Sequence, residues 1–286
     1  MFPLIAALLF VDSLHFIFAR LLLSHISPKV SVMYVLAIST AEVALFGLIR
    51  GRMHIEVLKE HLPFFLAIGF LVGASTNINY AAVAFIDPGT ASLLVKTSVL
   101  FGVGFGLFWL RERLTSAQIA GALVAIAGVL VVTFQPGDYL RLGSLMVLGS
   151  TVMYALHAAL VKRYGGGIDF LNFFLFRLLC TTGFLLLFAL GRGAFIWPSA
   201  TAWALLILTG TVDVVISRTL YYVALRRLKM SVHSVVLALS PVAAVLWSLL
   251  LFDVVPTLQQ LLGGAAVISG VVVMAAVASK TVNRNV

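Results

Sequence analysis

The chain has 286 residues, of which 62% are hydrophobic and 10% are charged, and its formal net charge is +9. Soluble domains are close to half apolar and about a quarter charged, so this composition excludes an ordinary soluble enzyme and indicates a membrane protein. The basic residues gather in the connections between apolar stretches rather than on one soluble face, which argues against a nucleic-acid-binding protein.

Hydrophobic stretches of about 20 residues recur along the whole chain, and each is long enough to cross a hydrocarbon core about 30 Å thick as a helix. We therefore expect an all-α membrane protein with ten transmembrane helices. The connections are too short for a soluble catalytic domain, and the absence of a G-x-x-x-x-G-K-[ST] loop argues against an ATP-driven pump. In chain order, the predicted helices are roughly 3–23, 30–49, 63–85, 90–110, 116–134, 141–161, 171–191, 201–224, 230–252 and 257–278.

The distribution of basic residues predicts the orientation of these helices. If the N-terminus is cytoplasmic, the outer side holds only Arg20, Lys29, Arg141 and Arg192. The positive-inside rule then places both termini in the cytoplasm of a bacterial cell, with the chain in the inner (plasma) membrane. The twelve basic residues on the inner side are Arg50, Arg52, Lys59, Arg111, Arg113, Lys162, Arg163, Arg226, Arg227, Lys229, Lys280 and Arg284.

The chain contains an internal repeat at an offset of about 141 residues. LTSAQIAGALVAIAGV (114–129) resembles PTLQQLLGGAAVISGV (256–271), and DSLHFIFAR (12–20) resembles YALHAALVK (154–162). The second match places His15 on His157. We predict two five-helix repeats, comprising residues 1–138 and 139–286.

The two repeats are expected to have opposite orientations in the membrane. Five helices per repeat is an odd number, so the second repeat enters from the other side. Equivalent loops also differ in charge, since RERL (111–114) corresponds to FDVV (252–255), and the basic copy lies inside. Inverted repeats are the architecture of many secondary transporters, whose binding sites lie near the midplane where the repeats meet.

Two motifs connect this pattern to a known family. LRERLTSAQIAGALVAIAGV (110–129) places an acidic residue after the fourth predicted helix and before a fifth helix rich in small residues, and FRLL (176–179) places an arginine in the second helix of the second repeat. In both features the chain resembles the EamA-type branch of the drug/metabolite transporter superfamily. The second acidic motif is reduced to FDVVPTLQQ (252–260). The resemblance implies membrane transport, with export the commoner direction.

Six charged side chains fall inside the predicted spans, three of each sign. Each costs roughly 2.5–3.5 kcal/mol at a helix centre on the insertion scale. They must therefore pair with one another, reach the interface or line a water-filled cavity. These residues are Asp12, Glu42, Asp213, Lys96, Arg177 and Arg218.

Asp12 and His15 lie one helical turn apart, so a carboxylate and an imidazole can share a cavity and a proton. We take them as candidates for proton coupling, together with Glu42 and with His157, the repeat mate of His15. The alternative is structural. The acidic side chains can form ion pairs that lock helices together, and a buried histidine is often an interhelical hydrogen-bonding group.

The candidate binding site starts from STNINY (75–80), a polar interruption of an apolar stretch that aligns with ISRTLY (216–221) at the repeat offset. Polar side chains in membranes often bond across helices for only about 0.6 to 2 kcal/mol, so packing is the alternative reading. The repetition favours two walls of one binding cavity. The predicted substrate-binding residues are Asn77, Asn79, Tyr80, Lys96, Asp213, Ser217, Arg218 and Tyr221.

These residues predict a secondary active transporter that works by alternating access. Mixed charges, amides and tyrosines suit a small polar or zwitterionic metabolite such as an amino acid. A lipid-head-group or nucleotide-sugar translocator and an uptake carrier for choline-like amines are the alternatives. We find neither H-E-x-x-H nor G-x-S-x-G, so we expect no enzymatic activity, cofactor or metal. The expected partners are a small-molecule substrate, membrane lipids and protons, in a monomer or homodimer.

Overall fold

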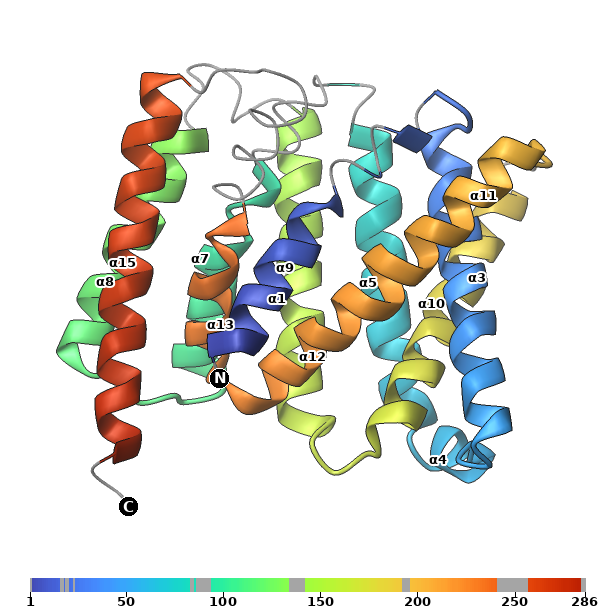
Figure 1. Ribbon diagram of the computed structural model, residues 1–286, viewed down its shortest axis with the longest axis horizontal. Helices are drawn as coiled ribbons and strands as arrows, with labels where there is room; N and C mark the ends of the chain where they lie inside the picture. Colours follow the sequence, from blue (N-terminus) through green and yellow to red (C-terminus); the bar gives the residue numbers. More distant parts are fainter. Residues whose placement is uncertain are drawn as a thin grey trace.

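The computed structural model describes residues 2–15, 18, 21–22, 24–82, 85, 94–133, 142–191, 196–240 and 257–283. Within these residues all regular structure is helical, and Figure 1 shows the helices arranged as a bundle. The elements are α1 (Phe2–Ser13), α3 (Pro28–Ile49), α4 (Ile55–Glu60), α5 (Leu62–Ala82), α7 (Ser98–Gly104), η1 (Phe105–Trp109), α8 (Ser116–Thr133), α9 (Leu142–Tyr164), α10 (Phe170–Gly191), α11 (Ala200–Thr209), η2 (Gly210–Ile216), α12 (Ser217–Arg227), α13 (Met230–Leu237) and α15 (Leu258–Asn283).

The helices confirm the all-α membrane fold. Among the described residues, five helices are long and apolar enough to cross a membrane, namely Val30–Ile49, Leu62–Asn79, Leu142–Tyr164, Phe170–Gly191 and Ala200–Arg227. Shorter apolar helices cover the cores of other predicted spans. The predicted helix 230–252 is described only as far as Ser240, and parts of 3–23 and 90–110 also lie outside the described residues. Ten spans therefore remain a prediction.

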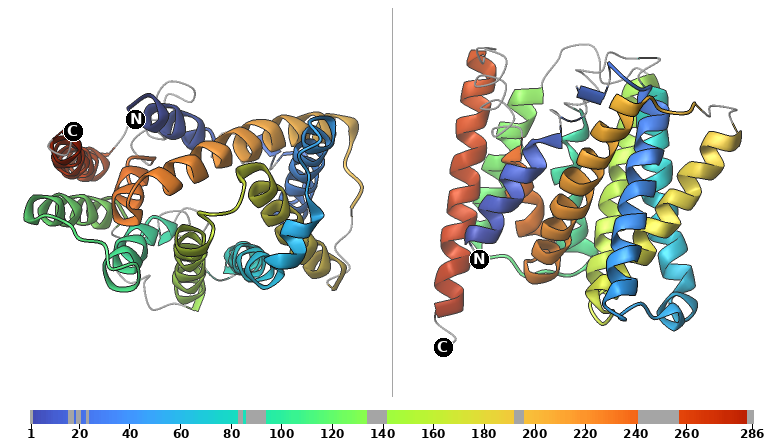
Figure 2. Two further views of the ribbon diagram at one scale, coloured as in Figure 1. Left: turned by 90° about the horizontal axis from the view of Figure 1, so that it is seen from below. Right: turned by 45° about the vertical axis from the view of Figure 1, so that its right-hand side comes forward.

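Helices α8 and α15 form one side of the bundle, away from α3 and α10 (Figures 1 and 2). α8 runs away from the end that holds α4 and α15 runs toward it, so the two are antiparallel. Their backbones meet at glycines: a Cβ on Gly121 would lie 2.7 Å from the Gly270 carbonyl oxygen, and one on Gly128 would lie 2.7 Å from that of Gly263. Small residues permit this close approach between membrane helices. We call this contact the glycine seam.

The glycine seam has the pattern that a twofold relation between repeats would produce. By the repeat offset, Gly121 matches Gly263 and Gly128 matches Gly270. In the structure, however, Gly121 contacts Gly270 and Gly128 contacts Gly263, so each contact joins a glycine of one matched pair to a glycine of the other. Such cross-pairing is characteristic of an isologous contact, in which residue i of one copy meets residue j of the other and j meets i. α3 and α10 pack together in the same way, and Thr40 Oγ1 lies 3.0 Å from Thr182 Oγ1.

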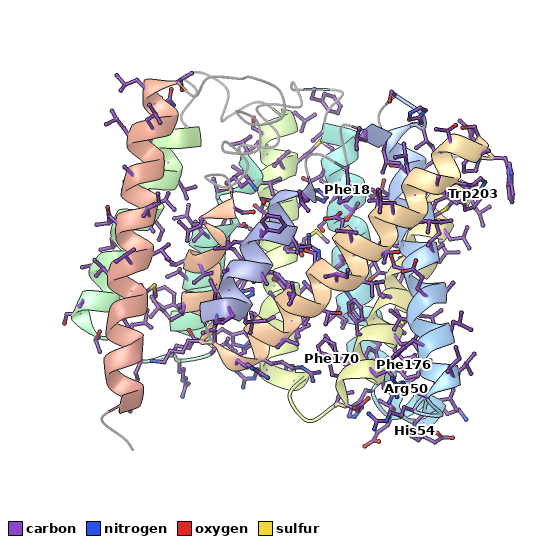
Figure 3. All side chains as sticks on the ribbon, in the orientation of Figure 1. Phe18, Arg50, His54, Phe170, Phe176 and Trp203 are labelled. Carbon is purple, nitrogen blue, oxygen red and sulfur yellow. The ribbon has the colours of Figure 1, made fainter. Side chains whose placement is uncertain are left out.

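The two ends of the bundle differ in chemistry. Arg50 and His54 lie at the end with α4, whereas Trp203 lies at the opposite end (Figure 3). Trp203 packs edge-to-face on Trp197, with ring centroids 5.5 Å apart. This separation agrees with the predicted basic and aromatic interfaces. The side that faces the cytoplasm stays a prediction, and we refer to the end with Arg50 as the basic end.

The basic end is closed by hydrogen bonds between segments far apart in the chain. The Glu112 carboxylate accepts bonds from the backbone N–H groups of Met230 and Ser231, at 2.5 and 3.0 Å, and from the Ser231 hydroxyl at 2.6 Å. It thus caps the positive N-terminus of α13. Lys162 Nζ donates to three carbonyl oxygens at the C-terminal end of α12. The ends of α12 and α13 are therefore fixed to α9 and to the segment before α8.

Candidate functional site

An irregular helical segment positions the first acidic side chain of the candidate site. Between α11 and α12 the chain forms the π-helix η2, and π-helical turns within α-helices frequently mark functional sites. Ser39 Oγ on α3 donates to the Gly210 carbonyl oxygen at 3.1 Å, which satisfies one acceptor of this segment. Asp213 lies on η2 with 8% of its side chain exposed. Its Oδ1 is buried without a hydrogen-bond partner among the described residues.

Asp213 contacts His15, which follows α1. Its Oδ2 lies 2.7 Å from His15 Nδ1, and half of the His15 side chain is exposed. The contact is an ion pair when the imidazole is protonated and a hydrogen bond when it is neutral. Protonation of His15 therefore changes the charge of this pair without requiring a new partner.

A second ion pair joins α12 to α1. Arg218 Nη2 on α12 lies 3.2 Å from Asp12 Oδ1 on α1, and the two side chains are 18% and 16% exposed. Asp12 Oδ2 also accepts a hydrogen bond from Ser240 Oγ at 2.8 Å. We call Asp12, His15, Asp213 and Arg218 the charged junction.

The charged junction brings together four of the residues predicted from the sequence. Its contacts lower the cost of placing these charges in a membrane, since Asp12 has an opposite partner in Arg218, and Asp213 has one when His15 is protonated. Asp12 and His15 lie one turn apart as expected, but each faces a different residue of the η2–α12 segment. Each of the two residues therefore also has a partner on the η2–α12 segment, and the sharing of a proton between Asp12 and His15 stays a prediction.

Three further predicted binding residues adjoin the junction. Tyr221 lies with its ring centroid 5.7 Å from the Arg218 guanidinium carbon, within cation–π range. Lys96, just before α7, interacts electrostatically with Asp12 and Arg218. Ser217 is buried, and its hydroxyl has no hydrogen-bond partner in the described part of the chain.

The polar stretch of α5 and the acidic residue of α3 have other described contacts. Asn79 Oδ1 accepts a hydrogen bond from the Ser150 hydroxyl on α9, and Asn77 lies partly buried two residues earlier. The side chain of Tyr80 is outside the described atoms. Glu42 accepts a hydrogen bond from Thr211 Oγ1 at 2.8 Å. The interactions described for Asn77, Asn79 and Glu42 do not join them to the charged junction.

His157 belongs to a separate buried cluster. Its Nε2 lies 2.8 Å from the Tyr222 hydroxyl, and its Nδ1 lies 3.3 Å from the Tyr154 carbonyl oxygen. The Arg177 guanidinium carbon lies 5.4 Å from the centroid of the Tyr222 ring. We call Arg177, Tyr222 and His157 the arginine–tyrosine cluster. These contacts are compatible with a structural role for His157 as well as with the predicted coupling role.

Sequence reasoning missed Tyr222 and Ser240 as partners of the candidate residues. Tyr222 follows Arg218 by four positions, so helical spacing places both on one face of α12. This spacing could have identified Tyr222 as a candidate from the sequence. Ser240 is a single hydroxyl in an apolar stretch, and its contact with Asp12 depends on how helices distant in the chain pack.

Comparison with known proteins finds one family model that matches twice. The model of the EamA-like transporter family matches residues 2–134 and again residues 141–276. A solved crystal structure superposes with a TM-score of 0.83 at 19% sequence identity, covering 97% of this chain and 98% of the other. At that identity the superposition shows the fold alone.

Curated relatives come from bacteria and an archaeon. "Uncharacterized transporter YdfC" of Bacillus subtilis is 26% identical over 254 residues, which cover 86% of this chain and 81% of that protein. "Probable terminal-alkyne amino-acid exporter" of Streptantibioticus cattleyicolor is 31% identical over 196 residues, covering 66% of this chain and 64% of the relative.

Proposed function

Because the chain belongs to the EamA-like transporter family, we propose that it is a secondary active exporter of a small zwitterionic metabolite such as an amino acid. Family membership confirms the resemblance inferred from the motifs and the location as a multi-pass integral membrane protein. Bacterial relatives agree with the predicted inner (plasma) membrane. The observation that carries the proposal is the charged junction, where α1 meets α12 through charges of both signs.

A zwitterion is the ligand that best matches the Asp12–Arg218 pair. Its ammonium group can replace Arg218 at Asp12 while its carboxylate replaces Asp12 at Arg218, so both side chains keep an opposite charge. A ligand with one charge would leave one side chain unpaired, and breaking a buried pair costs about 3–5 kcal/mol. This cost disfavours choline-like amines and anionic nucleotide sugars at the junction. The amino-acid exporter among the relatives points to the same substrate class.

Alternating access would exchange the contacts around the junction while the glycine seam persists. In the described state Glu112 and Lys162 close the basic end. Opening of that end would break these bonds and separate α12 and α13 from their neighbours. We propose that the predicted repeats, residues 1–138 and 139–286, rock about the seam in this step, as in other transporters with inverted repeats.

Protons are the proposed coupling ions. His15 can carry or release a proton while it stays in contact with Asp213. Asp12 and Arg218 interact electrostatically with His15, and Lys96 interacts with Asp12 and Arg218. Protonation of His15 makes the junction more positive and strengthens its hold on a substrate carboxylate. Loss of the proton weakens that hold.

Purified protein in liposomes tests the proposal. Labelled amino acids, choline-like amines and nucleotide sugars are offered as separate substrates, with and without an imposed pH gradient. We expect saturable movement of amino acids that the gradient accelerates, and its loss in Arg218→Gln. Movement of amines alone would favour the uptake carrier. Movement of none of these solutes would contradict small-solute transport and favour a lipid-head-group translocator.

A further inference from the structure

α10 carries a buried arginine, Arg177, for which the described residues supply no acidic partner. Arg177 is 3% exposed, and its Nε and Nη1 atoms are buried with no hydrogen-bond partner within the described residues. The buried or half-buried carboxylates described in the structure are already engaged: Asp12 with Arg218, Asp213 with His15, Glu42 with Thr211 and Glu112 with the N-terminus of α13. Arg177 therefore has a charge that nothing in this part of the chain neutralises.

The surroundings of Arg177 make this charge costly. A buried cation loses its hydration and is normally paired with an anion. The Tyr222 ring, 5.4 Å from the guanidinium carbon, supplies a cation–π contact, but such a contact does not neutralise a full charge. The same Tyr222 ring packs edge-to-face on Phe173 and Phe174, so apolar groups rather than water surround it. An anion is the missing partner.

The free donors at this place belong to Arg177 itself. His157 Nδ1 donates to the Tyr154 carbonyl oxygen, so Nε2 of the neutral imidazole accepts the proton of the Tyr222 hydroxyl, and the hydrogen-bonding groups beside the guanidinium are already used. A carboxylate carries one negative charge, as Arg177 carries one positive charge, and a guanidinium binds it with directed hydrogen bonds. A doubly charged phosphate would bring an excess negative charge into this apolar environment.

The arginine–tyrosine cluster lies on the side of the charged junction that faces the basic end. α12 runs from Arg218 toward that end (Figure 1), and Tyr222 lies one helical turn further along it. Phe176, the neighbour of Arg177, lies in the half of the bundle nearer Arg50 (Figure 3). A solute that passes between the junction and the basic end would therefore meet this cluster.

We propose that Arg177, through its unpartnered Nε and Nη1 donors, forms a second carboxylate-binding site, which the substrate occupies between the charged junction and the basic end. This inference rests on the proposed function for the identity of the carboxylate. The site becomes accessible when the basic end opens. Its role is to hold the substrate's carboxylate while the ammonium group is free to exchange at Asp12.

Formate binding tests the site without any assumption about the substrate. Thermal unfolding of the purified full-length protein is followed while sodium formate replaces sodium gluconate, a bulkier carboxylate, at constant ionic strength. Formate should raise the melting temperature of the wild type, and its apparent affinity should fall at least about tenfold in Arg177→Gln, equivalent to ~1.4 kcal/mol. Equal responses of the two proteins, or no response of the wild type, would overturn the proposal.

Two variants guard this test against trivial outcomes. Arg163→Gln removes an exposed guanidinium that also lies over aromatic rings, those of Trp109 and Tyr164, and should keep the wild-type formate response. If Arg177→Gln does not fold, Arg177→Lys decides, because it keeps the positive charge but removes the guanidinium fork that binds a carboxylate with two directed hydrogen bonds. Its formate affinity should fall severalfold, and an unchanged affinity would contradict the site.

Transport then separates this inference from the proposed function. Arg177→Gln should raise the KM for an amino acid at the basic side severalfold, with little change at the opposite side. A wild-type KM on both sides would contradict the second site while leaving the proposed function intact. If the wild type moves no amino acid, the proposed function fails, and the formate result alone decides whether Arg177 binds carboxylates.

Discussion

The glycine seam and the charged junction are both contacts between helices far apart in the chain, but they are built from opposite materials. At the seam, Gly121 and Gly128 bring the backbones of α8 and α15 together without any charge. At the junction, Asp12 and Asp213 meet cations across α1, η2 and α12, and some polar atoms keep no partner. A closely packed glycine contact gives a ligand no group to bind, whereas a partly exposed ion pair gives it charged groups with which it can exchange partners. The seam is therefore suited to a fixed support and the junction to a binding site.

Breaking the junction at its most buried acid should have the largest effect. Asp213→Ala leaves His15 without its carboxylate partner, and because half of the His15 side chain is exposed, we expect a cost below the about 3–5 kcal/mol of a fully buried pair. We expect a markedly lower melting temperature and no transport. Asp213→Asn preserves the shape and should regain much of the stability while the effect of the pH gradient on transport is lost. Gradient-driven transport by Asp213→Asn at the wild-type rate would contradict proton coupling at His15.

A substitution in the glycine seam should lower the stability of the protein without changing which substrate it prefers. A side chain at Gly128 would clash with the Gly263 carbonyl oxygen and the Val267 nitrogen, both 2.7 Å from its Cβ. Gly128→Val should cost ~1–3 kcal/mol through overpacking, measured as a drop in melting temperature, with no change in substrate preference. Gly183→Val on α10 is the matched control, since no atom of its surroundings lies within 4 Å of the new Cβ. Equal destabilisation by both variants would show that the close contact at Gly128 has no special part in stability.

Weakening the closure of the basic end should have the smallest effect on stability. Glu112→Gln removes the charge that caps α13, and a lost cap costs ~0.5–2 kcal/mol. Because the cap exists in the state closed at the basic end, the variant should favour opening there. We expect faster labelling of Ser234→Cys in a Cys180→Ser background. Glu60→Gln on the exposed α4 helix should leave the rate unchanged, and a similar increase in both would argue against a specific closure.

The helices of the fold were predictable because apolar runs of membrane length are visible in the sequence. The charges of the junction were also predictable, since Asp12, Asp213 and Arg218 are conspicuous inside such runs. Their pairing was not. It depends on helix tilt and on η2, which changes the direction of Asp213 within a helix that reads as continuous.

The predicted two-walled cavity shows the limit of repeat symmetry. The repeat aligns Asn77 with Arg218, but symmetry of sequence does not fix which neighbour each helix packs on. α5 packs against α9, where Asn79 meets Ser150, while α12 packs against α1, where Arg218 meets Asp12. The two polar stretches that the repeat aligns thus have different described partners, and their joint role as two walls of one cavity stays a prediction.

Amino-acid transport by the double variant Asp12→Asn/Arg218→Gln tests the central claim most directly. Replacing both members of an ion pair by neutral groups of similar shape is often close to neutral for stability. The double variant should therefore melt close to the wild type yet transport no amino acid in liposomes, because the pair of opposite charges that would exchange with the two ends of a zwitterion is gone. A stable double variant that transports at the wild-type rate would show that the pair only holds helices together and would contradict the proposed site.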